Sequence, residues 1–153
     1  MLELDSKIAA KYMLALAQSK GKVLNATQLQ KILFIGYGYK LANDSNNPLF
    51  SESPRAWPFG PVFPNVHKNV DAYESYSLDS DELSEIKKDK EITDLFTNLI
   101  NKYSIYTATK LSDWSHSKNS PWELTKRQAG FEWNMVIPDV LIKDYFKQFE
   151  NVV

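Results

Sequence analysis

The 153-residue chain contains no cysteine and only two histidines, His67 and His116. The missing cysteines exclude disulfide bonds, thiol nucleophiles and thiolate metal sites. Two histidines far apart in the sequence are a poor supply for a metal site, which needs several convergent ligands. The sequence also lacks a phosphate-binding glycine loop and the HExxH, GxSxG and EF-hand patterns. We therefore expect neither a metal nor another cofactor.

Long apolar runs and a strong charge of one sign are missing as well. The net charge is −1, so no overall field draws the chain to nucleic acid. No apolar run approaches the roughly 20 residues that span a bilayer. The N-terminus does not show the basic and then apolar pattern of a signal peptide. We expect a cytoplasmic protein that binds neither a membrane nor nucleic acid.

The charges that are present are unevenly distributed. Residues 1–40 hold six lysines against two acidic residues, and residues 79–94 hold seven acidic residues against three lysines. We favour two solvated helix faces that complement each other. The alternative is a polar patch that recognises a protein of opposite charge.

The remaining composition is that of a folded globule, because 43% of the residues are hydrophobic and 13% aromatic. Apolar residues recur at helical spacing along most of the chain, except between residues 45 and 64. The sequence therefore predicts a mainly α fold: a compact single-domain bundle, residues 1–153, of about five to seven helices, with a small extended or β element around residues 49–63. Helices are expected to begin near Asp5, Asn25 or Thr27, Pro64, Glu82, Thr107, Pro121 and Pro138.

Two glycines lie inside the second expected helix. Gly36 and Gly38 each weaken a helix by about 1 kcal/mol relative to alanine. Something must compensate for this loss. The simplest explanation is that another helix approaches closely at these positions.

The segment from residue 56 to residue 62 reads Ala-Trp-Pro-Phe-Gly-Pro-Val. Pro58 and Pro61 each fix their own φ angle, and Gly60 allows a backbone geometry that other residues avoid. The sequence thus predicts a stiff loop that carries Trp57 and Phe59. These aromatic side chains either fill the core, which we favour, or present a rigid surface to a partner.

Asp113 and His116 form the best candidate for catalysis. They are three residues apart, so on a helix they share a face and the carboxylate could orient the imidazole. A serine nucleophile would also need a strained turn and an oxyanion hole, which this context does not suggest. We favour a hydrogen-bond network that fixes a helix end against a neighbouring loop, and we expect no catalytic residue.

Three separated motifs resemble the Panacea domain family, which comprises SocA-like antitoxins and phage-associated GepA-like proteins. Residues 29–34, LQKILF, followed by Gly38-Tyr39, resemble the family's LQKLLYFAQGYYL helix. Residues 56–66, AWPFGPVFPNV, are similar to its AWxYGPVxPxVY segment. Residues 111–116, LSDWSH, with Ser120-Pro121-Trp122, resemble its LSxxTH…xPW pattern. The resemblance spans residues 5–147 in the family's order.

The chain departs from the family pattern at three positions. Ser115 stands where threonine is usual, and Phe59 and His67 stand where tyrosine is common. The lost tyrosine hydroxyls weaken any expectation that Phe59 or His67 forms a hydrogen bond with a partner. The fold that the resemblance implies does not depend on them.

The resemblance implies an antitoxin that neutralises a cognate toxin, encoded by the adjacent gene, through direct protein–protein binding. The motif residues are then candidates for the partner-binding site: Trp57, Pro58, Phe59, Gly60, Pro61, Val62, Asp113, His116 and Trp122. Two alternatives stay open, namely a hydrolase or transferase that uses Asp113 and His116 to reverse toxin action, and a proteolysis adaptor or regulator. A homo-oligomer is also open.

Overall fold

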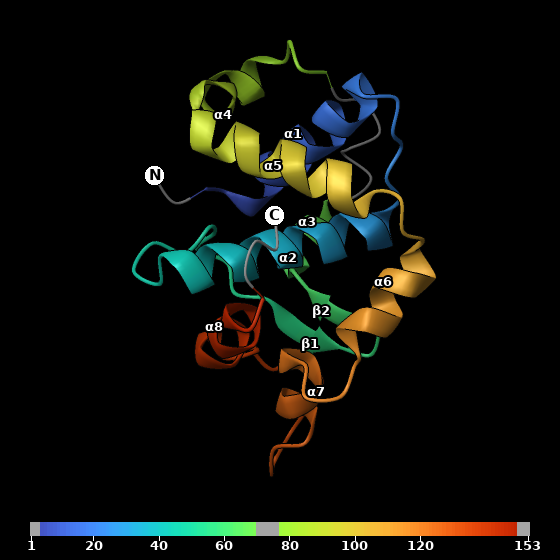
Figure 1. Cartoon of the computed structure of the whole chain (residues 1–153), viewed down its shortest axis with the longest axis vertical. Coiled ribbons are helices and arrows are strands. Elements are labelled where there is room, and N and C mark those ends of the chain that lie inside the picture. Colours follow the sequence, from blue (N-terminus) through green and yellow to red (C-terminus); the bar gives the residue numbers. More distant parts are fainter. Residues whose placement is uncertain (1–3, 70–76, 150–153) are drawn as a thin grey trace.

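A computed structural model describes residues 4–69 and 77–149. These residues form eight α-helices and one antiparallel sheet of two strands (Figure 1), which confirms the mainly α fold with a small β element. The helices are α1 Ser6–Ser19, α2 Ala26–Asn43, α3 Pro64–Lys68, α4 Ser84–Lys88, α5 Lys90–Tyr103, α6 Ala108–Ser115, α7 Pro121–Lys126 and α8 Asp139–Lys147. The strands are β1 Arg55–Trp57 and β2 Gly60–Val62. None of the described helices combines the length and the hydropathy needed to span a bilayer.

The capping residues account for where most of the helices begin. Asp5, Thr107 and Ser120 each accept a hydrogen bond from a backbone N–H in the first turn that follows. Asn25, one of the two expected starts of α2, forms a reciprocal capping box with Gln28. The start signals in the sequence therefore locate these helices correctly.

The extents of two further helices depend on local backbone features. The sequence predicts one long helix or two between Glu82 and Tyr103, and the structure has two, because Asp89 has extended backbone and caps α5. The helix that begins at Pro64 ends at Lys68. Its expected continuation through Val70 and Tyr73 lies outside the described residues.

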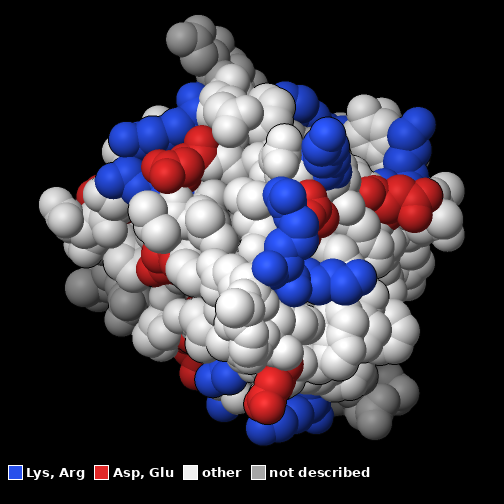
Figure 2. Space-filling view, turned by 90° about the horizontal axis from the view of Figure 1, so that it is seen from below, with Lys and Arg blue, Asp and Glu red and all other residues white. Residues whose placement is uncertain are grey.

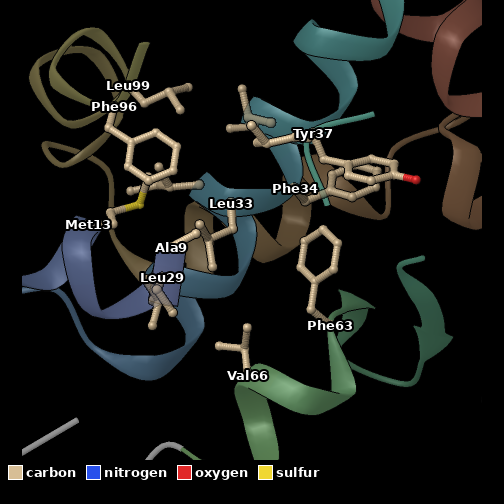
Figure 3. Close-up of a cluster of buried hydrophobic side chains, with 14 of the residues drawn as sticks. Ala9, Met13, Leu29, Leu33, Phe34, Tyr37, Phe63, Val66, Phe96 and Leu99 are labelled. Atoms are coloured by element: carbon tan, nitrogen blue, oxygen red, sulfur yellow. The ribbon is translucent and has the colours of Figure 1, made fainter. Parts of the chain in front are cut away.

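Helix α2 is the central element of the core. Every residue from Leu29 to Gly38 is buried, as is typical of a helix that other elements surround. In Figure 3, Leu29, Leu33 and Phe34 of α2 lie among side chains from α1, α5 and the segment around α3. Helices α6 and α8 and strand β2 also contact α2. The position of α2 thus determines where the sheet can lie.

The two glycines of α2 face other helices closely, as expected. A Cβ atom on Gly36 would lie 2.9 Å from Cδ1 of Leu99 in α5. A Cβ atom on Gly38 would lie 2.1 Å from two ring carbons of Phe146 in α8. Real Cβ atoms do not approach neighbours this closely, so residue 38 needs glycine at the observed helix separation, whereas at residue 36 the end of the Leu99 side chain would have to shift.

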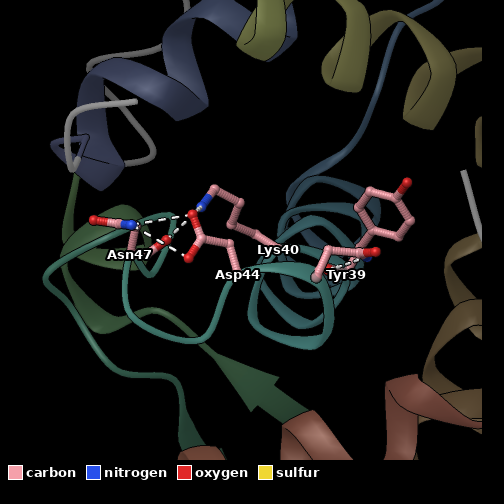
Figure 4. A network of polar contacts seen from close by, with 5 residues as sticks. Tyr39, Lys40, Asp44 and Asn47 are labelled. Atoms are coloured by element: carbon pink, nitrogen blue, oxygen red, sulfur yellow. Dashed lines mark hydrogen bonds and ion pairs between the residues drawn. The ribbon is translucent and has the colours of Figure 1, made fainter.

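Two lysines show how charge is accommodated in the fold. Lys11 of α1 pairs with Glu82 at 2.8 Å, which supports complementary helix faces as the interpretation of the uneven charge. Lys40 of α2 is buried, and its Nζ lies 3.2 Å from Oδ2 of Asp44 and 2.6 Å from the carbonyl oxygen of Asn47 (Figure 4). The buried ammonium of Lys40 is therefore matched by a carboxylate and a carbonyl.

We predict that Gly38→Ala lowers the free energy of unfolding by about 1–3 kcal/mol, because the added methyl group overlaps the Phe146 ring in a packed core. Urea denaturation measures the change. Gly36→Ala is the matched control with the smaller expected effect, since it meets only the end of the flexible Leu99 side chain. A Gly38→Ala protein more stable than the wild type, as helix propensity alone would give, would contradict the close-packing account.

Candidate functional site

The stiff loop of the sequence is a tight β-hairpin. Trp57 of β1 is paired with Gly60 of β2, so Pro58 and Phe59 form the turn between the strands. Gly60 has a φ of +107°, and a Cβ atom there would lie 2.6 Å from the Ser115 hydroxyl oxygen. Both the backbone conformation and the available space therefore require glycine at this position.

The end of β2 is locked to helix α2 through side chains of α2. The Gln30 amide donates to the carbonyl oxygen of Phe63 at 3.1 Å and accepts from the Phe63 N–H at 2.9 Å. Lys31 Nζ donates to the carbonyl oxygen of Pro61 at 3.1 Å. The Gln30 amide thus makes the same two hydrogen bonds with the Phe63 backbone that the peptide group of a neighbouring strand would make. The backbone just after β2 is therefore paired without a third strand.

The segment around residues 134–137 covers the outer edge of β1. The N–H of Asn134 donates to the carbonyl oxygen of Ala56 at 2.8 Å, and the N–H of Ala56 donates to the carbonyl oxygen of Met135 at 2.9 Å. The Trp57 indole donates to the side-chain oxygen of Asn134 at 2.8 Å. The sequence predicted residues 126–137 as irregular, and it missed this pairing because the segment shows no strand periodicity.

The third motif, residues 111–116 and 120–122 in and around α6 and α7, contacts the hairpin. The Trp122 indole donates to the carbonyl oxygen of Trp57 at 2.7 Å. The His116 ring stacks on Trp122, with ring centroids 4.1 Å apart. The Ser120 hydroxyl caps α7 and donates to the carbonyl oxygen of Ser115 at 3.1 Å. Motif segments that are far apart in the sequence therefore meet at the hairpin.

His116 is held by packing and not by Asp113. No hydrogen bond joins the two side chains in the part of the chain that the structure describes, and Asp113 is exposed. His116 Nε2 is buried and has no hydrogen-bond partner. The predicted Asp113–His116 network is therefore wrong, although His116 does fix the end of α6 against the hairpin, by stacking on Trp122 and by a hydrogen bond with the Phe59 backbone.

Burial lowers the pKa of His116 below its usual value, and the positive charge of Lys31 lowers it further. The Phe59 hydrogen bond and the Asp113 charge act in the opposite direction but do not outweigh these causes. The imidazole is thus neutral at pH 7. Within the described residues, no group of three or more His, Asp or Glu side chains could hold a metal ion.

The turn exposes an aromatic side chain. Phe59 is 68% exposed, so core filling is wrong for this residue. Trp57 is half-buried, Pro58 is exposed, and the other hairpin positions, Gly60, Pro61 and Val62, are buried. Trp133, which the sequence analysis did not single out, is 46% exposed and packs against Trp122.

A cavity of about 220 Å³ lies beside Phe59, between the hairpin, α2 and α3. Polar and aromatic side chains among its lining residues are Thr27, Gln30, Lys31, Trp57, Phe59 and His67. An open groove on the other side of Trp57 has a volume of about 940 Å³ and includes Arg55 and Trp133. A third, mostly apolar groove of about 610 Å³ lies away from the hairpin, between α5, α6 and α8.

The model of the antitoxin SocA-like Panacea domain matches residues 29–123. The chain belongs to this family. A curated relative, antitoxin SocA of Caulobacter vibrioides (strain NA1000 / CB15N), is 26% identical over 161 residues, which cover 97% of this chain and 85% of the relative. No solved structure matches the chain.

The matched region of this Panacea domain contains the three segments that meet at the hairpin. The resemblance inferred from residues 29–34, 56–66 and 111–122 is thereby confirmed. In the structure these segments bond to one another, since Gln30, Phe63, Trp57 and Trp122 supply the hydrogen bonds that hold the hairpin. The recognisable motifs of this chain therefore build one site.

We predict that Gln30→Met lowers the free energy of unfolding by about 2 kcal/mol, because it leaves the buried N–H of Phe63 without a partner, whereas the Phe63 carbonyl keeps the N–H groups of Val66 and His67. Thermal and urea denaturation measure the loss. Gln18→Met, on an exposed position of α1, is the matched control and should change stability by less than about 0.5 kcal/mol. Equal stability of the two variants would show that the Gln30 lock does not hold the hairpin.

We predict that His116→Gln reduces the loss of stability on acidification. The lowered pKa means that the unfolded chain binds the His116 proton more tightly than the folded chain. Its contribution to stability is therefore complete above the unfolded pKa of about 6.5 and declines as the pH falls toward the folded pKa. Urea denaturation between pH 7.5 and 5 measures this slope, with His67→Gln as the control. An unchanged slope in His116→Gln would contradict a neutral, buried imidazole.

Proposed function

We propose that this chain is the antitoxin of a toxin–antitoxin system and that it neutralises its toxin by direct binding. Membership of the antitoxin SocA-like family and the similarity to a protein named antitoxin SocA support this function. The proposed partner is a toxin encoded by the adjacent gene. Complex formation in a one-to-one or other fixed ratio distinguishes this mechanism from a catalytic one.

The observation that carries the proposal is the exposure of Phe59 on a hairpin that is held on both sides. A large apolar side chain that is 68% exposed contributes little to the fold. The bonds from Gln30, Asn134 and Trp122 leave the hairpin little freedom to lose on binding, and pre-organisation of this kind increases affinity. Rigid aromatic side chains are frequent anchors of protein interfaces.

The surroundings of the hairpin suit a protein partner. Trp133, Met135 and Val136 are exposed next to β1. Lys126 Nζ lies 5.2 Å from the centroid of the Trp122 ring and 5.8 Å from that of Trp133. Figure 2 shows several basic side chains close together on the lower face of the molecule, with acidic side chains beside them and uncharged surface around them. An apolar centre with charges near it is the usual arrangement of a protein interface.

Co-expression with the product of the adjacent gene tests the function. The neighbour alone should stop growth, this chain should restore growth, and the two proteins should co-purify. Restored growth without a complex would favour an enzyme that reverses the toxin's action. Loss of the neighbour from cells, without inhibition in a purified mixture, would favour a proteolysis adaptor. A harmless neighbour that does not bind would remove the antitoxin proposal.

We predict that Phe59→Ala weakens toxin binding about tenfold or more and changes the free energy of unfolding by less than about 0.5 kcal/mol. Calorimetric titration and urea denaturation give the two quantities. Ile105→Ala is the matched control, because Ile105 is also 68% exposed but lies between α5 and α6. If both variants bind like the wild type, the hairpin tip is not the contact surface.

A further inference from the structure

Lys31 is a buried lysine with an incomplete set of partners. Its relative exposure is 1%, and its Nζ donates one hydrogen bond, to the carbonyl oxygen of Pro61. In the described part of the chain no carboxylate lies within 4.0 Å of this ammonium group. An ammonium group has three donors and a full charge, so a single carbonyl satisfies it poorly.

Lys40 on the same helix shows the ordinary solution to this problem. It is also buried, but it pairs with Asp44 and donates to the carbonyl oxygen of Asn47 (Figure 4). The two lysines differ in one respect that matters: among the described residues a carboxylate lies within 4.0 Å of Lys40 Nζ and none lies within 4.0 Å of Lys31 Nζ. The described residues therefore leave the buried positive charge of Lys31 without a paired negative charge.

Within residues 4–69 and 77–149, the titratable groups nearest Lys31 give it no carboxylate partner. His116 at the end of α6 responds to the Lys31 charge, and Lys126 of α7 adds another positive charge near His116. His67 of α3 lines the same cavity as Lys31. Asp113 of α6 acts on His116 but is exposed. Burial lowers the pKa of Lys31 to about 8, so the amine is still mostly protonated at pH 7.

The cavity that Lys31 lines is small and bordered by the exposed Phe59. Its volume of about 220 Å³ is below the range of roughly 300–1,000 Å³ typical of cofactor and drug sites. It has room for a side chain or a chain end, with Trp57 and Gln30 among its walls. One cation in such a space matches one carboxylate.

We propose that the cavity beside Phe59 receives a carboxylate group of the toxin, which pairs with Lys31. This inference rests on the proposed antitoxin function and names the chemistry of the partner at the hairpin site. Phe59 supplies apolar contact at the rim, and Lys31 selects for an acidic group inside. The group that pairs with Lys31 is a carboxylate in either case, whether it comes from an Asp or Glu side chain or from the C-terminus of the toxin.

The pairing has a pH dependence with a definite sign. A carboxylate beside Lys31 favours the protonated amine and raises its pKa in the complex above the value of about 8 in the free chain. Toxin affinity is therefore greatest below about pH 8 and falls as the pH rises through that value. The pKa of His116 is lowered below its usual value, so His116 does not produce this step.

Lys31→Met and Lys40→Met form a matched pair of variants for the test. The expected result for Lys31→Met is toxin affinity lower by about thirtyfold or more, with stability equal to or above that of the wild type, because a desolvated charge is removed. Lys40→Met should lose stability, because it removes the ion pair with Asp44 and the donor to the carbonyl oxygen of Asn47, and should keep its affinity for the toxin. Calorimetric titration and urea denaturation of each variant measure both quantities.

The wild-type protein gives a test that does not depend on any variant folding. Calorimetric titration with the purified toxin between pH 7 and 9.5 should show the fall in affinity, and Lys31→Met should not show it. A series of Asp→Asn and Glu→Gln changes in the toxin identifies a side-chain carboxylate. A toxin extended by several residues at its C-terminus identifies a terminal carboxylate.

The possible failures can be distinguished. If the wild-type chain does not bind the toxin, the proposed function fails, and this inference fails with it. If the wild type binds and Phe59→Ala weakens binding, but Lys31→Met binds normally and the pH step is missing, only the role of Lys31 is overturned. Binding that is lost in Lys31→Met but insensitive to every carboxylate change in the toxin also overturns it.

Discussion

The exchange of two hydrogen bonds between the Gln30 side chain and the Phe63 backbone is the constraint on which the rest of the site depends. A two-stranded hairpin is marginal by itself in water. Here the residue that follows its second strand, Phe63, is hydrogen-bonded to the buried helix α2. These bonds fix the hairpin to the core. The indole of Trp122 and the segment around Asn134 hold the first strand. The turn at Pro58 and Phe59 projects from this frame.

This arrangement separates residues that build the site from residues that are free to contact a partner. Gly60, His116 and Trp122 are fixed by close packing, and changing them would alter the hairpin itself. Phe59 contributes little to the fold, since its side chain is mostly exposed. Lys31 belongs partly to both sets of residues. It donates a hydrogen bond to the hairpin backbone, yet its burial disfavours the charged form of its amine. A protein that needed only stability would do better with an apolar residue there.

Much of this could be predicted from the sequence, and the misses have a common physical cause. Capping residues and prolines located the helices, and Gly36 and Gly38 indicated close helix contacts, because these signals are local. The exposure of Phe59 could not be predicted, since prolines and glycine determine the path of a turn but not which side meets solvent. The contact of Asn134 with Trp57 joins residues far apart in the chain. His116 lacks the Asp113 bond for a related reason, because the hairpin and Trp122 determine its orientation.

We propose that the toxin binds over the hairpin held by α2. Hydrogen exchange of the chain, alone and in complex with the adjacent gene's product, tests it most directly. Binding over the hairpin should slow exchange in the complex at the amides of Trp57, Phe59, Gly60, Val62 and Phe63 and in the first turns of α2. Protection confined to the apolar groove lined by Tyr103, Trp114 and Phe146, with unchanged exchange at the hairpin, would contradict it.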